Sequence, residues 1–225
     1  MDDLPPEAVA VFGDAAELAQ RYANLLATDG VTRGLIGPRE TARLWDRHLL
    51  NCAVVAELLP ERGELVDIGS GAGLPGIVLA MLRPSLHVVL LEPLLRRSVF
   101  LEECVSALGL QNATVVRARA DDRAAARISA DVATARAVAP LDRLVGWAAP
   151  LLRPGGELLA IKGQSAEAEL AAAKPVLSKL GVRSAEVLQA GHGRVVSATT
   201  IVRVVIEGHG REERAGAQRS RRGVA

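Results

Sequence analysis

Aromatic side chains are scarce in this chain: of its 225 residues, the only Phe, Tyr and Trp residues are Phe12, Tyr22, Trp45, Phe100 and Trp147. The core must therefore be built from leucine, valine, isoleucine and alanine. We expect both tryptophans to lie in that core. A bound base would find few aromatic rings on which to stack.

Cysteines and long apolar runs are also lacking. The two cysteines, Cys52 and Cys104, are far apart and form no Cys-x-x-Cys pair, which excludes a disulfide framework and a cysteine-based zinc site. No apolar run approaches the roughly 18 residues of a membrane span, and no signal segment opens the sequence. We expect a cytoplasmic protein with no membrane partner and no metal.

Charge is nearly balanced along the chain except at its end. Hydrophobic residues make up 49% and charged residues 24%, which predicts a folded globular protein, and the net charge of +1 favours no class of partner. The final stretch has no helix or strand pattern and is rich in arginine, with Arg211, Arg214, Arg219, Arg221 and Arg222. We predict a disordered basic tail over residues 208–225, either solvated or contacting nucleic-acid phosphates.

The first 60 residues predict a helical extension. Asp14 is placed to cap a helix that runs to about Leu26, and Gly34–Gly37 breaks the pattern. Pro38 suits the first turn of a second helix, which ends near Pro60. One face of this second helix carries residues at intervals of four, namely Leu44, His48 and Cys52.

From residue 61 the pattern changes to short apolar runs that alternate with helical stretches. The expected strands are Leu65–Ile68, His87–Leu91, Ala113–Arg117, Val132–Ala135 and Glu157–Ile161. The expected helices lie near 74–82, 94–108, 140–150 and 165–180. Continuous apolar strands separated by helices indicate a parallel sheet that is covered on both faces.

The last two predicted strands differ from the others. Ser184–Leu188 and Thr199–Ile206 have a glycine turn and no helix between them, so they predict an antiparallel pair at the sheet edge. The fold class is therefore α/β and Rossmann-like, with a mostly parallel seven-stranded sheet and an antiparallel C-terminal strand. That layout is typical of the class I methyltransferase fold, here over residues 61–207.

A glycine-rich segment joins the first predicted strand to the first helix of the sheet. Gly71, Gly73 and Gly76 match the G-x-G-x-x-G pattern of dinucleotide-binding turns. Asp67 precedes them at the strand end and extends the pattern to D-x-G-x-G-x-G. Because glycine has no Cβ, the backbone here can approach a ligand closely. The segment predicts a nucleotide-like cofactor.

S-adenosylmethionine suits this segment better than a nicotinamide dinucleotide. It has no pyrophosphate but carries a sulfonium and an ammonium, which favour a carboxylate such as Asp67, directly or through water. Pro75 removes an N–H that a phosphate would use. Glu92 closes the second strand and can accept both ribose hydroxyls of either cofactor. An NAD-dependent oxidoreductase and a structural glycine turn are the alternatives.

Two further charged residues follow strand ends. Asp121, after the third strand, is expected either at the adenine edge or as a solvated helix cap. Arg136 ends the fourth strand, and the carboxyl ends of strands face the ligand crevice in open α/β sheets. A surface ion pair is the alternative for Arg136.

Several segments resemble the ribosomal RNA small-subunit methyltransferase G family, also called glucose-inhibited division protein B. They are Arg47–Cys52, Asp67–Ile77, Glu92 with Arg96 and Arg97, Arg119–Asp121, Ala135–Ala137 and Ile161–Gly163. They span about residues 40 to 165 in the family's order. The run Gly-Leu-Pro-Gly over 73–76 is more specific than the general methyltransferase pattern.

The resemblance implies methylation of N7 of one guanine in helix 18 of 16S rRNA, with the 30S subunit or its precursor as partner. By position, the cofactor would be bound by Gly69, Leu74, Ala120, Asp121 and Arg136, in addition to Asp67, Gly71, Gly73 and Glu92. Arg136 would also face the guanine, and His48 and Lys162 would lie near the active-site mouth. This sequence departs from many members at Asn51-Cys52, where Asp-Ser is common, and at Asp121, where Glu is common.

Guanine N7 carries a lone pair and no proton, so this reaction needs no general base, and alignment with the methyl group is the main task. The catalytic candidates are Arg136, His48 and Lys162. For His48 the alternative is a packed, hydrogen-bonded helix residue without a substrate contact. Other functions left open are a small-molecule or protein methyltransferase and a non-catalytic RNA-binding module. We expect a monomer.

Overall fold

A seven-stranded sheet lies at the centre of the computed structural model, which describes residues 4–207. The strand order is β3-β2-β1-β4-β5-β7-β6. The strands are β1 Gly63–Ile68, β2 Leu86–Leu91, β3 Ala113–Val116, β4 Ala130–Arg136, β5 Leu152–Lys162, β6 Val182–Ala190 and β7 Thr199–Ile206. All seven predicted strands are confirmed, and their ends differ from the prediction by at most two residues except at the start of β5.

Strand directions also follow the prediction. β1 pairs in parallel with β2 and β4, and β7 runs antiparallel to both β5 and β6. The mostly parallel sheet with an antiparallel C-terminal strand is confirmed. In β1, the consecutive apolar residues that predicted a strand are buried on both faces of the sheet, namely Leu65, Val66 and Ile68.

β5 is longer than expected and begins at Leu152 rather than Glu157. The residues between them, Arg153–Gly156, contain a proline and two glycines, which favour turns. They instead form an irregularity within the strand, since Ala130 pairs with Leu152 while Val132 pairs with Glu157. An inserted bulge accommodates proline and glycine without ending the pairing.

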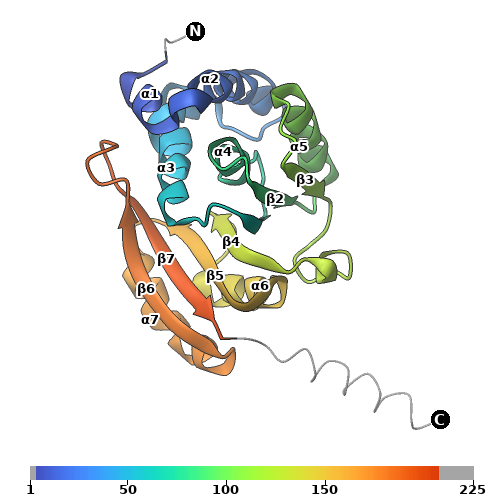
Figure 1. The fold of residues 1–225 in the computed structure, drawn as a ribbon, viewed down its shortest axis with the longest axis vertical. Helices are drawn as coiled ribbons and strands as arrows, with labels where there is room; N and C mark the ends of the chain where they lie inside the picture. Colours follow the sequence, from blue (N-terminus) through green and yellow to red (C-terminus); the bar gives the residue numbers. More distant parts are fainter. Residues whose placement is uncertain (1–3, 208–225) are drawn as a thin grey trace, which may run out of the picture.

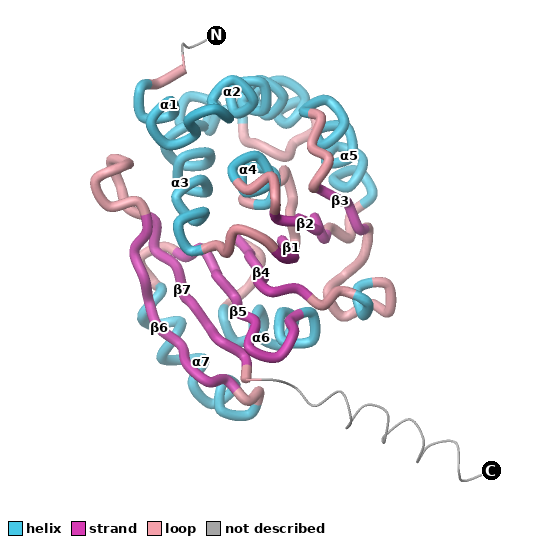
Figure 2. The backbone as a smooth tube through the Cα atoms, viewed as in Figure 1, coloured by secondary structure: helices cyan, strands magenta, loops and turns pink. Residues whose placement is uncertain are grey.

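Helices cover both faces of the sheet, as Figures 1 and 2 show. They include α4 Gly76–Leu82, α5 Leu95–Leu108, α6 Leu141–Ala148 and α7 Ala166–Lys179, each beginning within two residues of its predicted start. Helices α4 and α5 share one hydrophobic core with the N-terminal helices, whereas α6 and α7 contribute to a second core on the opposite face. The sheet is therefore the middle of three layers.

The N-terminal helices begin earlier than predicted. Helix α1 spans Pro6–Phe12, followed by a 3₁₀ turn η1 at Gly13–Ala15, helix α2 at Ala16–Leu25 and a π turn η2 at Leu26–Gly30. The expectation that Asp14 caps a helix was wrong, because Asp14 lies within η1 and no side chain caps α2. Gly13, with φ of 52°, makes the bend that separates α1 from α2.

The second helical stretch is present but irregular. It consists of η3 Pro38–Arg43, a π turn η4 Trp45–Leu49, α3 Leu50–Ala53 and η5 Val54–Leu58. Pro38 occupies the first turn, as predicted. Single π turns within helices often mark functional sites, and this one contains Arg47 and His48.

The N-terminal helices pack directly on the sheet. Their side chains, among them Tyr22 and Leu49, belong to the same buried core as Leu65 of β1 and Leu159 of β5. The domain boundary at residue 60 stays a prediction, and the predicted tail over 208–225 lies outside the described residues. Within residues 4–207, no helix is long and apolar enough to cross a membrane, and no cluster of His, Cys, Asp or Glu could hold a metal.

Candidate active site

A cavity of about 340 Å³ opens at the carboxyl ends of β1, β2 and β4. Its apolar walls include Ile68, Leu91 and Val138, and Glu92 supplies a carboxylate. Four of the predicted cofactor residues line it, namely Gly69, Glu92, Ala120 and Asp121. Its volume and its mixture of apolar walls with a few polar groups suit a nucleoside.

Glu92 is fixed by backbone donors at the end of β2. Its side chain is 1% exposed, and its two oxygens accept hydrogen bonds from the N–H groups of Gly71 (2.9 Å) and Leu94 (3.0 Å). Each carboxylate oxygen can accept more than one hydrogen bond, so Glu92 can also accept ribose hydroxyls. The same carboxylate therefore shapes the glycine loop and faces the cavity.

Asp121 also lines this cavity. More than half of its side chain is exposed, and it pairs with the Arg119 guanidinium at 3.2 Å. The neighbouring Asp122, rather than Asp121, accepts the hydrogen bond from the Arg119 backbone N–H. Asp121 therefore remains oriented by a single surface ion pair.

Asp67 points into the protein and lines neither this cavity nor the larger one described below. Its buried carboxylate accepts hydrogen bonds from the Gly76 N–H (3.1 Å) and from the Thr134 hydroxyl (3.1 Å). Burial raises the pKa of Asp67 to about 6. A Cβ at position 76 would lie 2.7 Å from the Asp67 oxygen, so only glycine permits this contact.

The remaining loop residues predicted to bind the cofactor, Gly71, Gly73 and Leu74, also line neither cavity. Gly73 instead packs under the helical extension, where Tyr22 of α2 donates a hydrogen bond to the Ala72 carbonyl at 2.6 Å. A Cβ at position 73 would lie 2.7 Å from the Tyr22 hydroxyl oxygen. The glycine loop is thus held from below by Asp67 and from the extension by Tyr22.

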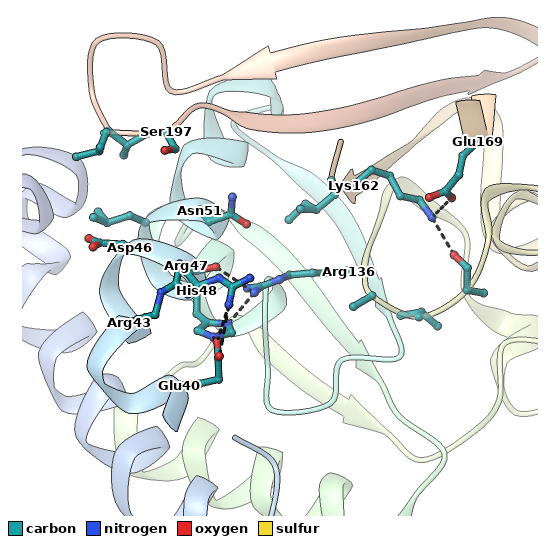
Figure 3. Close-up of a pocket in the computed structure, with 18 of the residues that line it drawn as sticks. Glu40, Arg43, Asp46, Arg47, His48, Asn51, Arg136, Lys162, Glu169 and Ser197 are labelled. Carbon is teal, nitrogen blue, oxygen red and sulfur yellow. Dashed lines mark hydrogen bonds and ion pairs between the residues drawn. The ribbon is translucent and has the colours of Figure 1, made fainter. Parts of the chain in front are cut away.

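A second, larger cavity of about 1120 Å³ lies beside the first (Figure 3). It is lined by the second helical stretch, by the ends of β4 and β5, and by the loop between β6 and β7. All three catalytic candidates, His48, Arg136 and Lys162, line it. Charged side chains of both signs face it, including Glu40, Arg43, Asp46, Arg47 and Glu169.

Arg136 crosses from the end of β4 to the helical extension. Its guanidinium donates to the Arg47 carbonyl (3.0 Å), to Nδ1 of His48 (2.6 Å) and to the Cys52 sulfur (3.2 Å). The alternative of a surface ion pair for Arg136 does not describe these contacts, since none of these three partners is a carboxylate.

Lys162 lies at the end of β5 and is equally constrained. Its Nζ donates to the Ala139 carbonyl (2.9 Å) and to Glu169 (2.7 Å), and only 11% of its side chain is exposed. In Figure 3 it points away from Arg136 and toward Glu169. Lys162 therefore fixes the loop that follows β4 while lining the larger cavity.

The two cavities meet immediately after Arg136. Ala137 and Val138 line both of them. Ala137 has a φ of 54°, a backbone conformation that residues other than glycine adopt rarely and mostly where surrounding structure enforces it. A nucleoside in the smaller cavity and a second ligand in the larger one would therefore both lie against this short segment.

Sequence reasoning missed two residues of the site. Glu40 bonds to His48, and it lies one further interval of four before Leu44, His48 and Cys52, so extending that row would have found it. Trp147 was expected in the core; it packs against the core that contains α6, but it also lines the smaller cavity, with the Arg143 guanidinium 5.3 Å from its ring centroid. No local signal distinguished that position from an ordinary buried one. Trp45 packs edge-on against Phe12, as a core residue does.

Comparison with known proteins bears directly on this geometry. The family model described as rRNA small subunit methyltransferase G matches residues 15–196. The chain belongs to this family. It is 59% identical over 196 residues to the ribosomal RNA small subunit methyltransferase G of Thermobifida fusca, covering 87% of this chain and 82% of that protein. For the Streptomyces coelicolor protein of the same name, identity is 57%, covering 90% and 85%.

Solved structures share the fold of this family member. A SAM-dependent O-methyltransferase from Thermotoga maritima superimposes with a TM-score of 0.56 at 14% identity, covering 71% of this chain and 66% of that one. M. jannaschii TYW2 in complex with AdoMet gives 0.55 at 17%, covering 70% and 74%. The class I methyltransferase fold is therefore confirmed.

As a member of the small subunit methyltransferase G family, the chain is an S-adenosylmethionine-dependent methyltransferase. The smaller cavity suits the adenosine part of that cofactor, because the buried carboxylate of Glu92 lines it and apolar side chains form its walls. Family membership sets aside the NAD-dependent oxidoreductase.

Proposed function

We propose that this protein methylates N7 of a guanine in helix 18 of 16S rRNA. The observation that carries the proposal is the junction at Ala137 and Val138, where a nucleoside-sized cavity meets a larger charged one. Membership of the small subunit methyltransferase G family supports rRNA as the substrate. The guanine would enter the larger cavity and the cofactor the smaller one.

Glu92 would hold the ribose of the cofactor, and Ala120 and Asp121 would lie along the adenine. When bound, S-adenosylmethionine supplies an electrophilic methyl group on a sulfonium. Arg136, which donates hydrogen bonds and accepts none, suits an acceptor such as the cofactor carboxylate or the guanine carbonyl. Asp67 would act from beneath the glycine loop through its charge and through the shape that it gives the loop.

Two carboxylates of the larger cavity, Glu40 and Glu169, fit a reaction without a general base. A hydrogen bond from His48 lowers the pKa of Glu40. Burial raises the pKa of Glu169, but hydrogen bonds from Lys162 and Ser165 outweigh it, so the net shift is downward. A carboxylate with a lowered pKa is a poor proton acceptor at neutral pH. Guanine N7 has no proton to lose, so alignment, which is worth up to about 7–11 kcal/mol, can supply the catalysis.

A small-molecule methyltransferase predicts a closed, apolar substrate pocket. The larger cavity has charged walls and, at about 1120 Å³, exceeds the roughly 300–1,000 Å³ of ordinary small-ligand sites. Both properties favour a polar macromolecule such as RNA. With few aromatic rings available, arginine guanidinium planes are the expected stacking partners for its bases.

Labelled S-adenosylmethionine tests this proposal when it is given to the purified protein with small ribosomal subunits from cells that lack the gene. We expect label in 16S rRNA, at a guanine whose N7 methylation makes the chain cleavable at that position. Naked 16S rRNA in a parallel reaction shows whether the assembled subunit is needed. Absence of label from both substrates over a range of magnesium concentrations would refute the proposal.

Gly71→Val and Gly181→Val form a matched pair for the same assay. Both glycines have similar positive φ values, 59° and 63°. At Gly71 the nearest atom to an added Cβ, outside the adjacent residues, would be 3.7 Å away, and at Gly181 none would lie within 4 Å. We expect Gly71→Val to abolish methyl transfer because it distorts the loop, and Gly181→Val, between α7 and β6, to leave it intact. Equal activity of both variants would count against the glycine loop as part of the site.

A further inference from the structure

The position of Arg136 depends on a chain segment far from it in sequence. All three acceptors of its guanidinium hydrogen bonds lie in the helical extension, at Arg47, His48 and Cys52. Figure 3 shows the Arg136 side chain reaching toward this cluster, with His48 between Arg136 and Glu40. The extension therefore decides where the cationic group at the end of β4 stands.

The chemistry of these contacts fixes the state of His48. A guanidinium has only donors, so Nδ1 of His48, 2.6 Å away, must be the bare, accepting nitrogen. The other ring nitrogen, Nε2, lies 3.0 Å from a carboxylate oxygen of Glu40, which only accepts. Nε2 must therefore carry the proton, and the imidazole is neutral.

We propose that His48 is a positioning residue, which Glu40 fixes as the neutral Nε2–H tautomer so that its Nδ1 holds the Arg136 guanidinium where cofactor and guanine meet. If His48 were instead a packed helix residue without a role in the site, methyl transfer would not depend on which ring nitrogen accepts the hydrogen bond.

The surroundings of the ring favour the neutral form. Burial, and after it the positive charge of Arg136, lowers the pKa of His48, while Glu40 acts in the opposite direction. Arg43 and Arg47 are the other charged groups near the pair: Arg47 contacts Glu40 at 3.4 Å, and the positive charge of Arg43 also acts on Glu40. A proton on Nδ1 would remove the acceptor and place two cations in contact, so the arrangement holds only while His48 is neutral.

Nuclear magnetic resonance of the ring nitrogens tests the tautomer in the free, full-length protein near neutral pH. We expect the ¹⁵N shift of a bare nitrogen at Nδ1 of His48 and of a protonated nitrogen at Nε2, and in Arg136→Ala the Nδ1 resonance should move. A protonated Nδ1 in the wild-type protein would overturn the inference. This readout needs no activity, so it is independent of the proposed function.

Two substitutions then separate the ring nitrogens. His48→Asn places an amide oxygen near the position of Nδ1, so Arg136 keeps its acceptor while the contact with Glu40 is lost. His48→Gln reaches the position of Nε2, so Glu40 keeps its partner while Arg136 loses its acceptor. On small subunits we expect His48→Gln to transfer methyl groups about 10- to 100-fold more slowly than His48→Asn, the usual worth of a hydrogen bond to a charged group.

Thermal unfolding of both variants shows whether each has folded. Arg136→Ala gives the rate of methyl transfer that remains without the guanidinium. This part of the test rests on the proposed function, because it reads methyl transfer to rRNA. If His48→Gln is as active as His48→Asn, the inference fails. If the wild-type protein itself transfers no methyl group, the proposed function fails and the ring-nitrogen shifts still decide the role of His48.

Discussion

Three ionisable side chains end neighbouring strands, and each is tied to the protein in a different way. Glu92 accepts backbone hydrogen bonds and still faces a cavity, Asp67 is wholly buried beneath the glycine loop, and Arg136 extends to the helical extension. These hydrogen bonds and the burial of each side chain determine which of the three can contact a ligand directly. Asp67 can act only through the charge it carries and the loop that it holds.

Substitution of Asp67 separates these two effects. Asp67→Asn keeps an oxygen for the Gly76 N–H but removes the charge, whereas Asp67→Ala removes both. We expect Asp67→Ala to lower the free energy of unfolding by about 1–3 kcal/mol through the unsatisfied Gly76 N–H. Asp67→Asn should be at least as stable as the wild type above pH 6, where the wild-type protein must bury a charge. Denaturant unfolding measures both, and equal destabilisation of the two variants would contradict the account.

The raised pKa of Asp67 also predicts a pH dependence of cofactor binding. The folded protein binds this proton more tightly than the unfolded chain, so the carboxyl group loses its charge as the pH falls through about 6. Affinity for the positively charged cofactor should therefore fall with pH in that range. Calorimetric titration from about pH 5 to about pH 8 measures it. Asp67→Asn should show weaker binding without this fall; the same fall in that variant would assign it to another group.

At the scale of elements, the helical extension acts as part of the methyltransferase fold. Helix α2 supplies Tyr22 to the glycine loop, and the irregular stretch from η3 to η5 supplies three acceptors to Arg136. The extension and the sheet share one core. Substitutions in the extension should therefore change the affinity for the cofactor.

Tyr22→Phe tests that coupling. It leaves the buried ring in place but removes the hydrogen bond to the Ala72 carbonyl. We expect a loss of about 1–2 kcal/mol in unfolding free energy, because a buried acceptor loses its partner, together with weaker S-adenosylmethionine binding. Thr32→Val is the control, since it removes an exposed hydroxyl that bonds to the carbonyl of Thr28, four residues earlier. An unchanged cofactor affinity in Tyr22→Phe would show that the extension does not support the loop.

The elements were largely predictable because their signals are local. Buried strands such as β1 are continuous apolar runs, and the glycine segment marks the turn between β1 and α4. The bulge at Arg153–Gly156 was missed because proline and glycine favour a turn unless strand pairing on both sides overrides them. Asp14 was misassigned because the 3₁₀ turn at Gly13–Ala15 leads directly into α2, whose N-cap position is Ala15.

At the scale of the whole molecule, the site is assembled from parts that the sequence keeps far apart. The larger cavity draws on residues from Glu40 to Ser197, and the Arg136–His48 contact joins positions 88 residues apart. Motifs could predict that Glu92 and Asp121 lie at one cavity, but not that Asp67 faces inward or that Glu40 completes the cluster. Such long-range contacts depend on how the extension packs on the sheet, which no short motif records.

Mass mapping of 16S rRNA modifications tests the central claim most directly. It compares cells with the gene, cells without it and cells that carry the Gly71→Val form. We predict one 7-methylguanine in helix 18 that is lost without the gene, returns with the wild-type gene and does not return with Gly71→Val. Identical modification maps in all of these cells would contradict the account.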